Sequence, residues 1–174
     1  MKLIFLDIDG VLNYKLFWKE KRQCERRDEL SDDAPDGAHD LCENRIELLN
    51  SLIEDTGAKV VVSSSWRKNR TIEELQTVLD YKGFKGEVID KTPCLYFKER
   101  EDGYHRSVPR GNEIKAWMEM NKGILGEKFS KVKYVIFDDD SDMLYWQRNQ
   151  FIHIDRYIGL TPNIIWRAKQ FLMS

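Results

Sequence analysis

The sequence has little net charge and few cysteines. Its 174 residues include 28 lysines and arginines against 30 aspartates and glutamates, so the net charge is only -2 at pH 7. A chain this close to neutrality does not attract nucleic acid as a whole, and any such binding requires a local basic patch. The three cysteines are an odd number without metal-ligand spacing, which argues against a disulfide framework.

Long apolar runs are also missing. None approaches the ~20 residues that a membrane-spanning helix needs. The first apolar run, residues 1–6, is closed by an acidic pair where a signal peptide would stay apolar. Together with reduced cysteines, these absences predict a soluble, cytoplasmic protein. The chain has no repeat, low-complexity tract or linker, and its length suits one domain over residues 1–174.

Strand-like and helix-like segments alternate along the chain. This alternation predicts an α/β fold with a doubly wound (Rossmann-like), mainly parallel sheet. Strands are expected near residues 1–6, 58–62, 88–89, 132–137 and 151–154. Helical spacing and start signals predict helices near residues 41–53, 72–79, 111–118 and 162–172. Asp40 is the expected cap of the first helix, and Thr71 with Glu74 forms a capping box at the second.

Two aspartates, Asp7 and Asp9, stand one residue apart at the end of the first strand, followed at once by Gly10. Side chains alternate along a strand, so both carboxylates face the same side and repel each other. A hard divalent cation such as Mg²⁺, which prefers oxygen ligands, would remove that repulsion. The alternative interpretation is a pair of solvated turn residues after an edge strand.

Two later strands also end in polar residues, the second in Ser63 and the fourth in four aspartates: Asp138, Asp139, Asp140 and Asp142. The carboxyl ends of parallel strands share one edge of the sheet, where ligands bind. Carboxylates from two distant segments are therefore expected to converge. Solvated turns do not require this convergence, whereas a metal site does.

These strand ends resemble the four motifs of the haloacid dehalogenase (HAD) superfamily of phosphohydrolases. Residues 7–12 (Asp-Ile-Asp-Gly-Val-Leu) look like the first motif, Ser63 like the second, Arg110-Gly111 at a helix start like the third, and Asp138-Asp139 like the fourth. Their order and spacing agree with the family. The resemblance implies the HAD type of sheet, a small flap or cap insertion, a Mg²⁺ ion and hydrolysis of a phosphomonoester.

A narrower resemblance covers nearly the whole chain. Residues 56–59 (Thr-Gly-Ala-Lys), 63–67 (Ser-Ser-Ser-Trp-Arg), 92–93, 110–114 and 159–161 are similar to the small HAD domains of RNA-repair ("Swiss Army Knife") proteins. This resemblance implies that the substrate is a phosphate at a nucleic-acid end.

The resemblance also implies roles for individual residues. Asp7 would be the nucleophile that forms an aspartyl-phosphate, and Asp9 the general acid and base. Ser63 would bind a phosphoryl oxygen, and Arg110 would neutralise charge developing on the phosphoryl group. The implied metal ligands are Asp7, Asp9 through its backbone carbonyl, Asp139 and Asp138.

Several assignments stay open at this stage. Asp140 and Asp142 compete with Asp139 as metal ligands, because the register of the fourth motif varies. Lys115 competes with Arg110 as the third-motif cation, although backbone N–H groups at the helix start favour an anion beside Arg110.

The second motif contains further candidates. Ser64 is a candidate substrate contact and alternatively serves the turn. Arg67 could reach a second phosphate on the substrate. Trp66 is interpreted as a packing residue.

Substrate choice is expected to depend on two segments outside the sheet. The insertion at residues 13–39 mixes basic and aromatic residues, including Trp18, which suits a nucleotide through stacking and charge pairing. It equally suits an amphipathic helix whose Trp18 packs on the body. The second segment, residues 97–109, adds four basic residues beside Arg110: Lys98, Arg100, His105 and Arg106.

The sequence therefore predicts a Mg²⁺-dependent phosphatase acting on a terminal phosphate of RNA or DNA, with the 3′ position favoured. A nucleotidase or small-molecule phosphatase is the alternative within the enzyme class. A metal-dependent nuclease would use the same carboxylates without a covalent intermediate, and a binding module would need none of them. A phosphoryl-accepting receiver domain is disfavoured, because its acceptor aspartate follows a strand from the middle of the sequence, whereas Asp7 follows the first strand of this chain.

Overall fold

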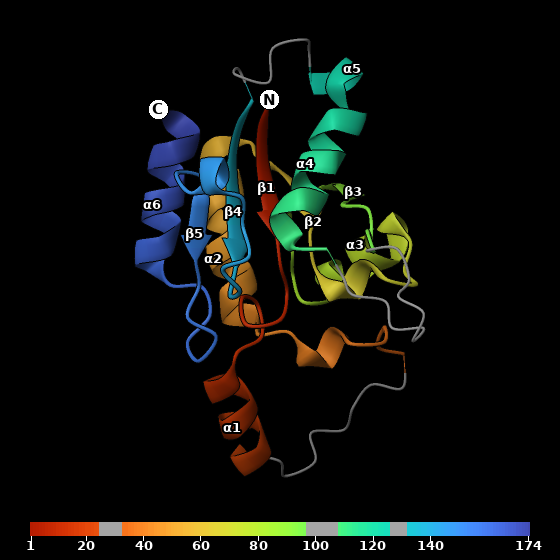
Figure 1. The fold of residues 1–174 in the computed structure, drawn as a ribbon. Helices are drawn as coiled ribbons and strands as arrows, with labels where there is room; N and C mark the ends of the chain where they lie inside the picture. The colour runs from red at the N-terminus through yellow and green to blue at the C-terminus, as the bar shows by residue number, and fades with distance from the viewer. Residues whose placement is uncertain (25–32, 97–107, 126–131) are drawn as a thin grey trace.

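Five parallel strands form one sheet in the computed structural model (Figure 1). The structure describes residues 1–24, 33–96, 108–125 and 132–174. The strands are β1 (Lys2–Leu6), β2 (Lys59–Val62), β3 (Val88–Lys91), β4 (Lys133–Asp138) and β5 (Phe151–His153). Their spatial order is β3-β2-β1-β4-β5. The predicted doubly wound, parallel α/β sheet is confirmed.

The central strand, β1, fixes where the site forms. Residues 3–6 are fully buried, and their continuous apolar run suits a strand covered on both faces. Leu6 pairs with Val62 of β2 on one side and with Phe137 of β4 on the other. The chain leaves β1 for β2 on one side and returns on the other at β4, so β1 is the point where ligands bind in such sheets.

Helices cover both faces of the sheet. They are α1 (Lys15–Cys24), α2 (Glu43–Thr56), α3 (Ile72–Tyr81), α4 (Arg110–Met120), α5 (Lys122–Leu125) and α6 (Pro162–Met173). Apolar residues of α2, α3 and α6 share one core with the strands, whereas α4 and α5 contribute to a second core on the other face. Leu6 belongs to the first core and Phe5 to the second, as the alternation of side chains along a strand requires.

Two helix starts test the signals read from the sequence. The Thr71–Glu74 capping box is present at the start of α3 and is confirmed. The prediction that Asp40 caps the next helix is wrong, because α2 begins at Glu43 with Cys42 as its cap residue. Asp40 instead ends a short 3-10 turn, Ala38–Asp40. The backbone N–H of Cys42 donates to the Leu12 carbonyl at 3.0 Å, which fixes the chain here and delays the helix.

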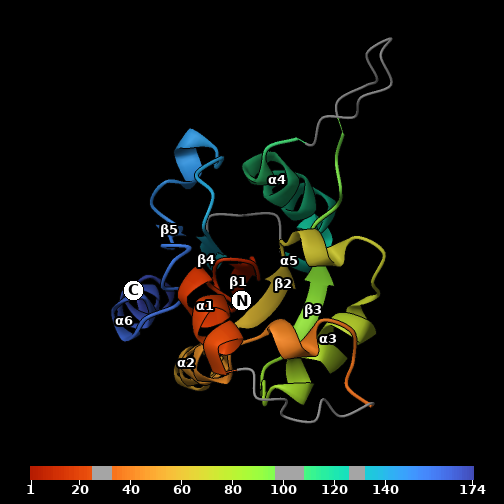
Figure 2. The same ribbon diagram turned by 90° about the horizontal axis from the view of Figure 1, so that it is seen from below.

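Helix α1 lies beyond the carboxyl ends of the strands, whereas both chain termini lie at the opposite end of the sheet (Figure 1). Figure 2, seen from the carboxyl ends, shows α1 in front of the strands. Its first turn is fixed by backbone hydrogen bonds from Lys15 to Arg156 and from Leu16 to Tyr157, at 2.9 and 3.2 Å. This helix occupies part of the insertion at residues 13–39.

Every helix within the described residues is too short or too polar to cross a lipid bilayer.

Candidate active site

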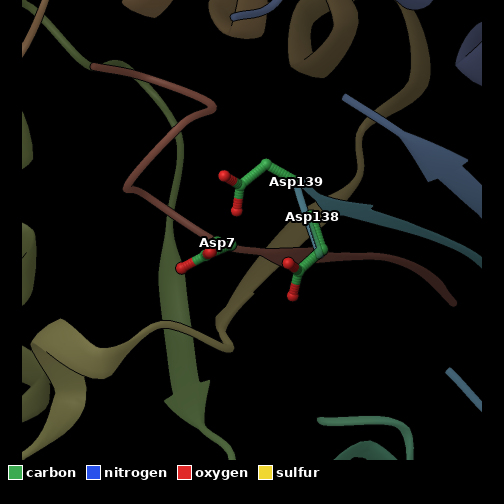
Figure 3. A group of neighbouring side chains, drawn as sticks. All are labelled: Asp7, Asp138 and Asp139. Carbon is green, nitrogen blue, oxygen red and sulfur yellow. The ribbon is translucent and has the colours of Figure 1, made fainter. Parts of the chain in front are cut away.

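Three aspartates gather where β1 and β4 end. Asp7 directly follows β1, Asp138 is the last residue of β4, and Asp139 comes next. One carboxylate oxygen from each lies within 4.8 Å of the others, and Figure 3 shows the three side chains around one space. The backbone N–H of Asp7 donates to the Phe137 carbonyl at 2.9 Å, which holds the two strand ends together. These three residues form the carboxylate cluster.

The carboxylate cluster is electrostatically unfavourable without a cation. Burial raises the pKa of Asp7 to about 6. Burial, followed by the nearby Asp7 carboxylate, raises the pKa of Asp138 to about 8. Burial also raises the pKa of Asp139. Buried carboxyl groups this close cannot all ionise unless a positive charge offsets their repulsion.

The donor set fits a hard divalent cation. Carboxylate oxygens are the protein ligands that Mg²⁺ prefers. Gly10 also supports the geometry, because a Cβ at this position would overlap the Asp139 carboxylate. Its φ of +76° is a conformation that glycine adopts without strain. The glycine after the acidic pair therefore lets Asp139 approach β1.

Two serines follow β2 beside Asp7. The Ser63 backbone N–H donates to the Leu6 carbonyl at 2.8 Å, so Ser63 stands next to the end of β1. The Ser63 hydroxyl is buried and has no hydrogen-bond partner among the described residues. A hydrogen bond from Ser64 lowers the pKa of Asp7, although burial outweighs it. The Ser64 oxygen also accepts from the Trp66 backbone N–H at 3.4 Å, so it serves the turn as well.

Arg110, at the start of α4, reaches the carboxylate cluster. Its Nε lies 3.6 Å from an Asp138 oxygen, and its guanidinium also lies 3.2 Å from Glu113. The competing cation, Lys115, lies on the same helix, and its ammonium is 3.8 Å from Glu119. Of these two cations, the structure brings only Arg110 next to the cluster.

Arg67 and Glu113 form a buried ion pair behind the cleft. The guanidinium lies 2.5 Å from a Glu113 oxygen, and both side chains are almost fully buried. Arg67 also donates to the backbone carbonyls of Thr92 and Ser64. Since Glu113 binds Arg110 as well, this carboxylate orients both arginines. Sequence reasoning missed Glu113, although its position three residues after Arg110 is the spacing of helix neighbours.

The remaining aspartates of the β4 end lie around the cluster. An oxygen of Asp142 accepts from the Arg110 backbone N–H at 2.8 Å, so this residue caps α4. Asp140 is exposed and lies 2.8 Å from Arg156. The same Arg156 lies 3.1 Å from Asp139. The structure therefore brings Asp138 and Asp139 to Asp7, and uses Asp140 and Asp142 elsewhere.

Asp9 lies apart from the cluster and is exposed. Its carboxylate accepts hydrogen bonds from the Trp66 indole N–H, at 3.0 Å from each oxygen, from the Ser65 hydroxyl at 3.3 Å and from the Asn13 amide at 2.9 Å. Trp66 was predicted to be a packing residue, and this hydrogen bond is the part that the sequence did not predict. Nothing in the sequence around Trp66 indicated that its indole N–H would donate to Asp9.

The predicted substrate contacts outside the strand ends are more dispersed. Trp18 lies on α1 and lines a separate hollow with Lys15, Lys19 and Tyr157. Arg106 and the basic residues at 98, 100 and 105 lie outside the described residues. Lys68, which the sequence did not single out, is exposed and lines the cleft beside the cluster, about 150 Å³ in volume.

The comparisons with known proteins agree with the fold and the strand ends. A family model described as the HAD domain in Swiss Army Knife RNA repair proteins matches residues 3–164. No curated protein and no solved structure matches the chain. The resemblance read from the sequence is confirmed, and with it the assignment to the HAD hydrolases. The chain belongs to the family of HAD domains in Swiss Army Knife RNA repair proteins.

Proposed function

We propose that this protein hydrolyses phosphomonoesters through an aspartyl-phosphate on Asp7. The observation that carries the proposal is the arrangement around this carboxylate. Asp7 lies in the carboxylate cluster, a buried hydroxyl without a partner among the described residues lies at the end of the neighbouring strand, and Arg110 approaches from α4. A nucleophile, a hydrogen-bond donor and a cation at one point suit phosphoryl transfer.

Each residue has a separate task in the proposed reaction. The Asp7 carboxylate attacks phosphorus, and the bond from phosphorus to the leaving oxygen breaks. Asp9 donates a proton to that oxygen, and then takes a proton from the water that hydrolyses the aspartyl-phosphate. Ser63 donates to a phosphoryl oxygen, and Arg110 stabilises the negative charge on the phosphoryl group. Asp7 is regenerated and inorganic phosphate is released.

The cluster would hold Mg²⁺ through Asp7, Asp138 and Asp139, together with the backbone carbonyl of Asp9. When bound, this ion neutralises the carboxylates and the phosphoryl oxygens. Asp138 then keeps Arg110 in place, because their side chains lie 3.6 Å apart. The insertion at residues 13–39, of which the structure describes 13–24 and 33–39, would serve as a flap on a single domain.

The proposed substrate is a terminal phosphate of a nucleic acid, with the 3′ position favoured. The description of the family names RNA repair proteins. Lysines at two places near the cluster also suit binding of a nucleic-acid strand. Lys68 lines the cleft, and within the described residues it takes part in no ion pair. It replaces Arg67 as the candidate for a second phosphate, because Arg67 is buried against Glu113.

The second place is the hollow along α1. Trp18 and Tyr157 there offer aromatic rings, and Lys15 and Lys19 offer positive charge. Tyr157 follows Arg156 in the chain, and the Arg156 guanidinium lies 3.1 Å from Asp139, so the hollow and the cluster are linked through neighbouring residues. Aromatic rings with lysines suit single-stranded nucleic acid, which stacks its bases and pairs its phosphates.

The test is release of inorganic phosphate in the presence of Mg²⁺. A 3′-phosphorylated oligonucleotide, its 5′-phosphorylated form and mononucleotides are compared, each with the wild type and Asp7→Asn. We expect the 3′-phosphorylated strand to be preferred and the variant to be inactive. Preference for mononucleotides would favour a nucleotidase, and cutting of an unphosphorylated strand would favour a nuclease. Absence of any hydrolysis would refute the phosphatase proposal.

A further inference from the structure

Asp9 is held by three side-chain donors although it is exposed. The Trp66 indole N–H lies 3.0 Å from both carboxylate oxygens, so it bridges them. Ser65 donates to one of these oxygens and Asn13 to the other. An exposed carboxylate needs no protein donors, because water satisfies it. The three protein donors therefore fix the direction in which the Asp9 carboxylate points.

Asn13 and Trp66 differ in what else they hold. The Asn13 side-chain oxygen accepts from the Gly10 backbone N–H at 3.0 Å, so this residue also shapes the loop after β1. Within the part of the chain that the structure describes, the Trp66 indole N–H donates only to Asp9. Loss of the indole N–H would therefore leave the loop after β1 intact and change only the orientation of the Asp9 carboxylate.

The Trp66 ring is itself fixed from its other side. The Arg70 guanidinium lies 5.0 Å from the ring centroid, and Arg70 pairs with Asp36 at 2.8 Å. A Cβ at Gly37 would lie only 3.0 Å from two ring carbons, so the glycine allows this segment to pack on the indole. Residues 36–37, near the end of the insertion, therefore help to hold the Trp66 ring in place.

We infer that Trp66 is a positioning residue that aims the Asp9 carboxyl group at the leaving oxygen of the substrate. This inference rests on the proposed function, in which Asp9 is the general acid. Among the described residues, the Trp66 side chain donates hydrogen bonds to Asp9 and to no residue of the carboxylate cluster. The Trp66 backbone N–H donates to Ser64, and a substitution of the side chain keeps that bond. Trp66 therefore acts on proton transfer rather than on phosphoryl binding. Its ring is held in place by residues 36–37 of the insertion and by Arg70.

A general acid matters most when the leaving group is poor. An alkyl phosphate, such as a 3′-phosphorylated strand or glycerol phosphate, expels an alkoxide that must be protonated. p-Nitrophenyl phosphate expels a stable phenolate that needs no proton. Loss of positioning at Asp9 therefore slows the alkyl ester and spares the aryl ester, whereas general damage to the site slows both.

The experiment compares kcat and KM of the wild type, Trp66→Phe and Ser65→Ala on glycerol phosphate and on p-nitrophenyl phosphate. For Trp66→Phe we expect kcat on glycerol phosphate to fall about 10-fold, part of the 10²–10⁴-fold that general acid catalysis supplies, with less than about 3-fold on the aryl ester. KM should change little on either. Ser65→Ala should show the same selectivity with a smaller loss. Trp166→Phe, on an exposed position of α6, is the matched control and should keep both rates.

Two results would overturn the inference. One is an equal loss on both esters, which would mean that Trp66 serves only packing. The other is full activity of Trp66→Phe on glycerol phosphate, which would mean that Asp9 needs no help from the indole. A wild-type protein that hydrolyses neither ester and no 3′-phosphorylated oligonucleotide would instead refute the proposed function, and the inference with it.

Discussion

The buried interior and the exposed rim of the candidate active site accommodate carboxylates in different ways. In the interior, Asp7 and Asp138 are only 6% and 2% exposed, and burial raises the pKa of both. On the rim, Asp9 is exposed and its oxygens accept three side-chain hydrogen bonds. The interior therefore depends on a cation, whereas the rim depends on donors and water. Substitutions in the interior should change both stability and catalysis, and those on the rim should change kinetics alone.

The largest expected effect is that of Asp7→Asn. Removal of the nucleophile should lower phosphate release more than ~10³-fold. The same change removes one of the two buried acids of the cluster, so the metal-free variant should melt at the same temperature as the wild type or higher. Phosphate release and thermal melting in EDTA measure the two effects. A variant that melts well below the wild type would contradict this account of the interior.

The second prediction concerns the ion pair behind the cleft. Arg67→Met leaves Glu113 without its nearest cation, and breaking a buried pair in this way costs ~3–5 kcal/mol in the free energy of unfolding. Urea titration measures this loss. Lys85→Met is the matched control, because the Lys85–Glu54 pair is exposed and such pairs contribute below ~1 kcal/mol. Equal effects of both changes would show that Arg67 is not structural.

The fold was predictable from the sequence because strands and helices alternate with clear start signals. The meeting of Asp7 with Asp138 and Asp139 was predictable as well, since parallel strands end at one edge of the sheet. The directions of neighbouring side chains in the turn Ser65–Arg67 were not. The prediction that Arg67 reaches a phosphate is corrected only by knowledge of Glu113 on α4. Trp66 does pack on the core, as predicted, but its hydrogen bond to Asp9 was not predicted. Only the folded chain brings Glu113 to Arg67, and Asp9 to Trp66.

The third prediction is a pH dependence of stability. The pKa of Asp7, about 6, and that of Asp138, about 8, lie above the ordinary value of 3.8. Between pH ~4 and ~8 the folded protein then binds more protons than the unfolded chain, so the free energy of unfolding falls as pH rises through this window. Thermal melts in EDTA at pH 5.5 and pH 8 measure the difference.

Mg²⁺ is the control for this dependence. Addition of Mg²⁺ at pH 8 should raise the melting temperature, because an ion bound only to the folded state stabilises it by mass action. Asp138→Asn should reduce both the pH dependence and the response to Mg²⁺. Stability that stays flat with pH in EDTA would contradict the raised pKa values of Asp7 and Asp138. A Mg²⁺ response that survives Asp138→Asn would place the cation outside the carboxylate cluster.

The smallest expected effect is on the rim, at Lys68. Lys68 is exposed and lines the cleft, so Lys68→Ala should raise KM for a phosphorylated oligonucleotide without changing kcat or the melting temperature. Loss of one phosphate contact should also lower the salt dependence of binding by ~0.7 in the log–log slope for a single strand. Lys85→Ala provides an exposed lysine elsewhere for comparison. p-Nitrophenyl phosphate has no second phosphate, and its KM should not respond. A rise in KM on both substrates would mean that Lys68 acts on the scissile phosphate, which would move it from the rim to the interior.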